Sequence, residues 1–227
     1  MILRSALVSA SVLLLASCSG SDGGEGEEAP APAGPQDAFW AALSSHCGGA
    51  YAGALVSDDE ADADLQGAGM VMHVRDCSDS EIRVPFHIQA ADGEWNRSRT
   101  WVFTRTGTGE DAGLRLKHDH RHEDGTSDAV TMYGGDTADA GIARAQEFPV
   151  DEESIALFKA EGLDVSVTNI WRVEIDPAPE SGGAQNAQFA YQLKRTVEGG
   201  APQPRNFRVE FDLTQPVDAP PPPWGSE

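Results

Sequence analysis

Positive charge, cysteine and long apolar segments are all scarce in this sequence. Its 16 Lys and Arg residues are outnumbered by 37 Asp and Glu residues, which gives a formal net charge of −21. A field of this sign repels nucleic acid, so no nucleic-acid partner is expected, and it favours cations or basic proteins. The alternative is that the charge serves only solubility or adaptation to salt. After residue 16, no stretch approaches the roughly 18 apolar residues of a membrane-spanning helix.

Several motifs that mark active sites are missing as well. The glycine pair Gly134-Gly135 lies in the segment Met132 to Thr137, which lacks the Gly-Lys-Ser/Thr of a phosphate-binding loop and is interpreted as a turn. The sequence contains neither Gly-x-Ser-x-Gly nor His-Glu-x-x-His. Serine-hydrolase and zincin functions are therefore unsupported, and the sequence favours a protein that is not an enzyme.

The N-terminal segment has the pattern of a secretion signal. Arg4 is its only charged residue, and the apolar stretch from Ala6 to Ala16 has the length of a signal core, too short to span a bilayer. The segment ends in Leu15-Ala16-Ser17-Cys18, which resembles the lipobox of bacterial lipoprotein precursors. The alternative is an ordinary secretion signal in which Cys18 has no special role.

The lipobox resemblance implies that residues 1–17 are a signal peptide. It also implies that Cys18 becomes the N-terminus, with a diacylglyceryl thioether and a further acyl chain such as palmitate on its amine. Two or more chains hold a protein stably at a membrane. Ser19, in place of Asp, implies the outer membrane, with the protein in the periplasm or at the cell surface. Removal of the signal peptide takes away Arg4 and no acidic residue, so the net charge falls by one from −21 to −22.

The remaining chain divides by composition into a tether and a domain. Residues 19–36 (SGSDGGEGEEAPAPAGPQ) cannot bury an apolar core and are predicted to be a disordered tether. Residues 37–227 are long enough to form one domain with a substantial core. Cys47 and Cys77 are the two cysteines left after lipidation, and an oxidising compartment favours a disulfide between them. Such a cross-link would stabilise the fold by roughly 3 kcal/mol.

Segments in which apolar and polar residues alternate recur throughout the predicted domain, as expected for strands with one buried face. We predict eight or nine strands over residues 51–55, 70–75, 82–88, 99–106, 114–122, 130–134, 165–175, 189–195 and 207–213. Their short connections allow sequence neighbours to pair antiparallel. The sequence therefore predicts an all-β antiparallel meander closed into an up-and-down barrel, with a β-sandwich as the alternative.

Two helices are expected beside these strands. The first spans residues 38–46, with Asp37 as its N-cap. The second spans residues 151–161, where Asp151 is the N-cap and Gly162 ends the helix. It is the one helix predicted to interrupt the meander.

A histidine-rich segment is the candidate metal site. In an extended strand, His118, His120 and His122 project from one face, and Glu123 or a residue of a neighbouring strand could complete the ligand set. Imidazole binds zinc, copper and iron, so a divalent transition metal or haem is the cofactor this pattern indicates. The alternative is a solvated hydrogen-bonded cluster. Two further histidines are expected to be exposed and are weaker ligand candidates: His73 and His87.

Two aromatic segments are candidates for a ligand-binding pocket. Arg99 and Trp101 share a strand face with Phe103, and they could line a pocket; the alternative places the two rings in the core and the arginines at its rims. Asn169 shares a face with Trp171, so its amide would point inward. There it would orient a polar ligand or, alternatively, bond to neighbouring backbone.

Several segments resemble an uncharacterised family of secreted bacterial proteins: Ser98-Arg99-Thr100-Trp101, Leu114 to Gly125, Thr131 to Gly135, and Phe211-Asp212-Leu213-Thr214 with Pro220 to Gly225. The resemblance spans most of residues 37–227 and implies no activity. At the level of fold, the meander also resembles calycin-like barrels such as lipocalins, with Gly49-Ala50-Tyr51 in place of their Gly-x-Trp motif.

These observations support three hypotheses of function. The first is a lipid-anchored module that binds a small apolar or amphipathic ligand inside the barrel. The second is a structural or assembly protein of the envelope whose surface binds another envelope protein. The third is a metal- or haem-binding protein that uses the histidine cluster.

Overall fold

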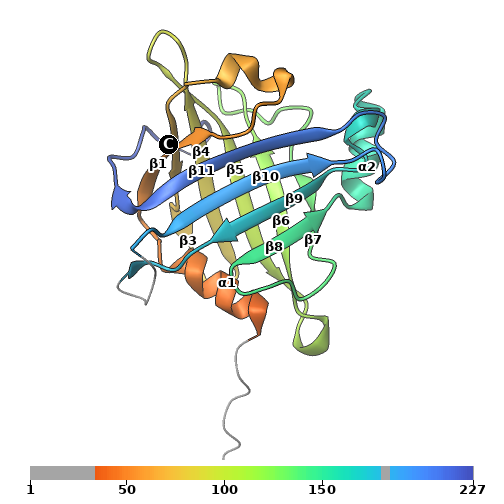
Figure 1. Ribbon diagram of the computed structural model, residues 1–227, viewed down its shortest axis with the longest axis horizontal. Coiled ribbons are helices and arrows are strands. Elements are labelled where there is room, and N and C mark those ends of the chain that lie inside the picture. The colour runs from red at the N-terminus through yellow and green to blue at the C-terminus, as the bar shows by residue number, and fades with distance from the viewer. Residues whose placement is uncertain (1–33, 180–184, 227) are drawn as a thin grey trace, which may run out of the picture. The chain divides into compact units, whose positions relative to one another are not determined.

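The computed structural model describes residues 34–179 and 185–226. Within them, ten strands wind into a nearly closed antiparallel barrel in the order β7-β6-β5-β4-β2-β1-β11-β10-β9-β8 (Figure 1). Almost every strand pairs with its neighbour in sequence, so the prediction of an all-β up-and-down barrel is confirmed. The predicted signal peptide, Cys18 and residues 19–33 of the predicted tether lie outside the described residues.

The strands outnumber the sequence-based prediction. Their bounds are β1 Ala50–Leu55, β2 Met70–His73, β3 Asp76–Cys77, β4 Glu81–Gln89, β5 Trp95–Thr106, β6 Gly113–His120, β7 Tyr133–Asp136, β8 Ala145–Pro149, β9 Ile170–Ile175, β10 Gln188–Arg195 and β11 Arg205–Pro216. The prediction missed β3, which has only two residues and pairs with β4 beside the barrel path, and β8. Residues 165–169 do not extend β9, because a 3-10 helix, η3, occupies Asp164–Ser166.

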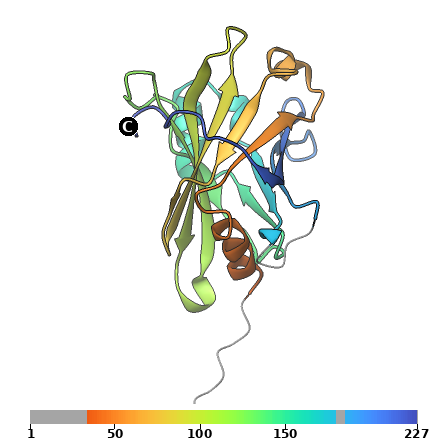
Figure 2. The ribbon, with the colours of Figure 1, turned by 90° about the vertical axis from the view of Figure 1, so that its left-hand side faces the viewer.

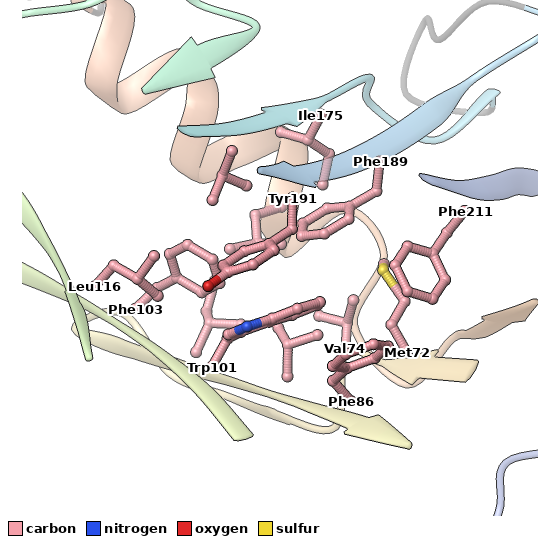
Figure 3. Packing of buried hydrophobic residues seen from close by; sticks show 14 of the residues in the cluster. Met72, Val74, Phe86, Trp101, Phe103, Leu116, Ile175, Phe189, Tyr191 and Phe211 are labelled. Carbon is pink, nitrogen blue, oxygen red and sulfur yellow. The ribbon is translucent and has the colours of Figure 1, made fainter. Parts of the chain in front are cut away.

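The interior of the barrel is filled by large side chains from alternate strand positions. Trp101 of β5 lies between Phe86 of β4, at a ring distance of 4.8 Å, and Tyr191 of β10, at 4.6 Å, with both rings nearly parallel to it. Phe189 and Phe211 continue this group across the barrel (Figure 3). The barrel centre is therefore a packed core. Trp101 and its aromatic neighbours form a layer between the two ends of the barrel.

A short helix closes one end of the barrel. Helix α1, Pro35–Ser44, buries Phe39 and Leu43 completely beneath the strands (Figure 2). It begins at Pro35, whose fixed φ suits the first helical position, so the predicted start at residue 38 and the Asp37 cap were wrong. The last two residues of the predicted tether belong to this helix. No helix in the described ranges combines the length and apolarity needed to cross a membrane.

A disulfide fixes the chain that follows α1. Cys47 and Cys77 are bonded, with their Cα atoms 6.3 Å apart, so the predicted pairing is confirmed. The bond ties the end of α1 to β3 and closes a sequence separation of 30 residues. The chain at this end of the barrel is thus cross-linked as well as packed.

The barrel closes at a seam between β7 and β8 that has no ladder among the described residues. Gly135 allows close approach there, because a Cβ at this position would lie 1.7 Å from the carbonyl oxygen of Pro149. The Asp151 N–H donates to the Gly134 carbonyl over 2.9 Å, and the Gly134 N–H donates to Ser154 Oγ over 2.8 Å. Residues at the N-terminus of a helix therefore hold the seam together.

That helix is the predicted inserted one. Helix α2 spans Glu152–Ala160, and Asp151 is its N-cap, accepting from the Ser154 N–H over 2.8 Å. The Lys117 ammonium of β6 pairs with the same carboxylate over 2.7 Å. A single cap thus holds α2, β6 and the seam together, and the prediction of Asp151 as the cap is confirmed.

Candidate functional site

The end of the barrel opposite α1 contains a cavity of about 210 Å³. The register of the strands creates it: Arg99 and Trp101 of β5 lie directly opposite His120 and His118 of β6, and His118 lies opposite Tyr133 of β7. Because alternate residues of a strand point inward, these side chains meet at one level of the barrel. The 3-10 helix η1, Glu60–Leu65, contributes to the same cavity (orange in Figure 1).

The cavity has an apolar part and a polar part. Its apolar lining comes from Phe86, Ile88, Trp101, Leu193 and Phe207. Its polar lining comes from His118, His120, Tyr133, Tyr191, Thr100 and the side chains of Arg99, Arg205 and Asp62. A neighbouring surface hollow of about 460 Å³, between η1 and the β4–β5 turn, shares Leu65, Ile88 and Arg99 with it. The combination of an apolar lining and a few convergent polar groups is typical of a small-molecule site.

His118 is locked in one tautomer by its two partners. Its Nδ1 lies 3.0 Å from the carbonyl oxygen of Tyr133, which can only accept, so Nδ1 carries the proton. Its Nε2 lies 2.8 Å from the hydroxyl of Tyr191 and therefore accepts from it. Both ring nitrogens of His118 are thus occupied, which suits a fixed structural wall more than proton transfer.

His120 makes a similar contact with the hydroxyl of Tyr133. Its Nε2 lies 3.2 Å from the Tyr133 hydroxyl, and its backbone N–H donates to Thr131 Oγ1 over 2.8 Å. The ring of Tyr133 also stacks on that of His118, with centroids 4.7 Å apart. The described residues provide no partner for the Nδ1 of His120, so this atom is available to a ligand.

The two histidines and two tyrosines of the polar lining, hereafter the His–Tyr wall, carry no charge at neutral pH. Burial lowers the pKa of His118 to about 3 and that of His120 to about 4, in the latter case with help from the Arg99 charge. Burial raises the pKa of Tyr133 to about 12 and that of Tyr191 well above its ordinary value. All four groups are therefore neutral hydrogen-bonding groups over the physiological range.

The two arginines that line the cavity differ in their partners. Arg205 donates to both oxygens of Asp62, over 2.6 and 2.5 Å, and pairs with Asp59 at 2.9 Å. These bonds fasten η1 to β11. Arg99 has no carboxylate within 4.0 Å in the part of the chain that the structure describes, and its Nη1 donates only to Ser98 Oγ, at 3.1 Å, and to Asn96 Oδ1, at 3.4 Å.

The structure brings together only some of the predicted ligand-site residues. Arg99 and Trp101 line the cavity, as does His118. Trp101 and Phe103 are also core residues with arginines at the ends of their face, which was the alternative interpretation. Trp171 is buried behind the cavity, with its ring 5.0 Å from that of His118.

Asn169 lies outside the cavity. It is buried, and its Oδ1 accepts from Nη1 of Arg195 over 3.3 Å, so its amide bonds to a neighbouring side chain. The Nε of Arg195 is buried without a partner in the described residues. Asn169 thus contributes to the packing beside the site.

The four residues proposed as metal ligands do not converge. β6 ends at His120, so His122 and Glu123 lie beyond the strand and are exposed, which corrects the prediction of one histidine face. Across residues 34–179 and 185–226, no three His, Cys, Asp or Glu side chains lie close enough to hold a metal ion. His73 is half-buried and His87 is buried, so the expectation that both are exposed was wrong.

Sequence analysis missed four residues that define the cavity: Tyr133, Tyr191, Arg205 and Phe207. The inward positions of Tyr191, Arg205 and Phe207 follow the alternation of β10 and β11, which was visible, whereas Tyr133 is the first residue of β7. Their meeting with β5 and β6 depends on how the barrel closes, and no local pattern carries that information.

Fold and cavity together define this chain as an antiparallel β-barrel with one end filled by side chains and a cavity at the other. Comparison with protein-family models, with curated proteins and with solved structures finds no match to this chain.

Proposed function

We propose that this protein is a non-catalytic binding module that holds one compact amphipathic molecule in the cavity at the η1 end of its barrel. The observation that carries the proposal is the cavity itself, where an apolar lining faces neutral hydrogen-bonding groups that are held in place by one another. Such a preorganised site binds without a large cost of ordering its side chains.

The size of the cavity limits the ligand. A cavity of about 150 Å³ lined by apolar side chains accepts benzene, and this one measures about 210 Å³. It therefore suits a single ring, or a branched aliphatic body, with one short polar substituent. A long acyl chain does not suit it, because Trp101, Phe189 and Phe211 fill the barrel below (Figure 3).

The chemistry of the wall favours binding over catalysis. Each ring nitrogen of His118 is engaged, and burial keeps the pKa of this residue far below neutral, so it is a poor general base. Tyr191 donates its proton to His118, and its hydroxyl also has a side-chain hydrogen bond with Trp101, so this group is held in place as part of the lining.

Anchoring at Cys18 completes the proposed function. A lipid on this residue would hold the domain beside the outer membrane through the segment before α1. Incorporation of an alkyne-tagged palmitate by the producing bacterium tests it: the native chain should be labelled, and the Cys18→Ala chain should not. Equal labelling of both chains would contradict lipidation at Cys18.

The binding proposal is tested by filling the cavity. Saturation-transfer NMR with a panel of single-ring probes should detect binding to the native protein and to Val197→Trp, which places an indole on an exposed loop. It should detect none with Leu193→Trp, which places the same group in the cavity. Equal binding to both variants would locate the site elsewhere, and no binding of any probe to the native protein would refute the proposal.

A further inference from the structure

We infer that the ligand of this cavity is a small organic anion, with its apolar body against Trp101 and a single carboxylate paired with Arg99. This inference rests on the proposed binding function and deepens it by naming the class of ligand. Arg99 and Arg205 both line the cavity, but only Arg205 pairs with carboxylates among the described residues.

Most Lys and Arg side chains of the described residues pair with a carboxylate, whereas those of Arg99, Lys159, Lys194 and Arg195 have none within 4.0 Å among these residues. Of its 227 residues, 37 are acidic and 16 are Lys or Arg, so carboxylates are in excess. Arg172, Arg205 and Arg208 each pair with two carboxylates. Arg99 lies within 4.0 Å of none among the described residues, although it is only half-exposed and lines two hollows. Arg195, a second arginine without such a pair, donates to Asn169 and does not line the cavity. Of the two arginines that do line it, Arg205 has carboxylate partners and Arg99 has none among the described residues, which leaves the Arg99 cation for a ligand.

The geometry of Arg99 suits an anion from outside the chain. Only its Nη1 donates to described residues, to Ser98 and Asn96, so the Nε and Nη2 donors are not engaged there. Two parallel N–H groups of a guanidinium match the two oxygens of a carboxylate, and such bidentate pairs are among the stronger hydrogen bonds in proteins.

The surroundings of Arg99 do not supply this anion. Asp62 is already held by two bonds from Arg205. Asp128 acts on the charge of His120, but its Oδ1 accepts from the Val130 N–H over 2.8 Å, and it is not within 4.0 Å of Arg99. The histidines of the wall are neutral at physiological pH and so neither attract the anion nor compete for it.

The rest of the cavity sets the shape of the ligand. Arg99 and Trp101 are two residues apart on the same face of β5, so a carboxylate at the guanidinium places its attached group near the edge of the indole, whose two faces are covered by Phe86 and Tyr191. Phe86 and Phe207 line the same space. A one-ring or branched aliphatic acid therefore satisfies both parts of the cavity at once, whereas an uncharged analogue of the same size satisfies only the apolar part.

The test compares two probes that differ in charge and hardly in size, phenylacetate and phenylacetamide, by isothermal titration calorimetry at pH 7. The native protein should bind phenylacetate at least about tenfold more tightly, because a charge-assisted pair is lost with the amide. Arg99→Gln should bind both probes equally. Lys194→Gln removes one positive charge from an exposed position of β10 and should keep the preference.

The outcomes separate this inference from the function on which it rests. Equal binding of both probes to the native protein would overturn the anion and leave the binding function intact. A preference that persists in Arg99→Gln would overturn the role of Arg99. Failure of both probes to bind any chain would refute the inference and count against the binding function. If Arg99→Gln does not reach the native circular-dichroism spectrum, Arg99→Lys replaces it, and it should keep a reduced preference because the charge remains while the fork is lost.

Discussion

The two ends of the barrel are built from the same strands, but one end is filled by side chains and the other contains a cavity. Strand β5 supplies Phe103 to the end closed by α1, where the ring lies 6.4 Å from that of Phe39, and Arg99 to the end covered by η1. At the α1 end, Phe39 and Leu43 pack into an apolar core beside a disulfide, and the polar contacts there include a His46–Tyr51 hydrogen bond and an Arg105–Asp37 ion pair. At the η1 end they are hydrogen bonds among histidine and tyrosine and an ion pair to Asp62.

This difference separates stability from binding along the barrel axis. Full burial of Phe39 and Leu43 gives the α1 end a large hydrophobic contribution, which depends on the area removed from water. The η1 end leaves a cavity, which costs packing contacts. Because the aromatic layer around Trp101 lies between them, changes at one end should be felt weakly at the other. Four expectations test this separation.

The largest effect is expected from removing a side chain that fills the α1 end. Phe39→Ala should lower the free energy of unfolding by about 4 kcal/mol, since it leaves a cavity beside Phe103 that the barrel cannot collapse. Urea unfolding with the disulfide intact measures this. A loss below about 1 kcal/mol, typical of surface substitutions, would show that α1 is only loosely docked.

The disulfide should contribute nearly as much. Replacement of Cys47 and Cys77 by alanine should cost about 3.5 kcal/mol, because a 30-residue separation is then no longer cross-linked in the unfolded chain. Phenylacetate affinity of the folded double variant should be unchanged, since the bond lies at the end away from the cavity. A weakened affinity would contradict the independence of the two ends.

Acid should destabilise the protein through the η1 end. The pKa of His118 is about 3 in the folded chain and about 6.5 in an unfolded one, so the unfolded state binds more protons between these values. Stability is therefore complete above pH 6.5 and falls as the pH decreases. At pH 4.5 the loss from His118 should be about 2–3 kcal/mol relative to pH 7.

Variants isolate this contribution from those of other histidines. His87 and His120, whose pKa values are about 4, add to the loss in the native protein. His118→Gln should reduce, by the share that His118 contributes, the dependence of unfolding free energy on pH between 4.5 and 7, and His122→Gln, at an exposed position, is the matched control substitution. Parallel curves for the native protein and His118→Gln would show that this imidazole is not kept neutral by the fold.

The smallest effect is expected from an apolar residue at the η1 end. Leu65→Ala should cost about 1 kcal/mol, because Leu65 is half-buried and already borders a hollow. Chemical denaturation of this variant beside Phe39→Ala gives the ratio between the two ends. Equal losses would mean that both ends contribute alike to stability.

Local patterns predicted the strands well where one face is buried. Phe207 to Leu213 alternates between buried and more exposed residues as expected, and it lies in β11. Strand β8 was not predicted because its buried and exposed residues do not alternate cleanly: Ala145 and Gln146 are both buried, and Pro149 lies at its end. The start of α1 was misplaced because Asp is the commoner N-cap, whereas the chain uses Gly34 followed by Pro35.

The site was less accessible to sequence reasoning than the fold. Arg99, Trp101 and His118 were each candidates, but in separate hypotheses, because their meeting depends on the pairing of β5 with β6 in one register. Tyr191 joins them from across the barrel and depends on closure. The end of β6 at His120 was also invisible in the sequence, where the run of histidines continues to His122 without interruption.

The seam between β7 and β8 has a mechanical consequence. Every other junction along the barrel path is a ladder of paired backbone groups, whereas this one depends on two glycines and the N-terminus of α2. The circumference of the barrel can therefore change at this junction without breaking the backbone hydrogen bonds of a ladder. Tyr133 begins the strand on one side of this junction. A change in circumference at this junction would move Tyr133, which lines the cavity, while Arg99 and Trp101 both lie on β5, which is paired on both sides.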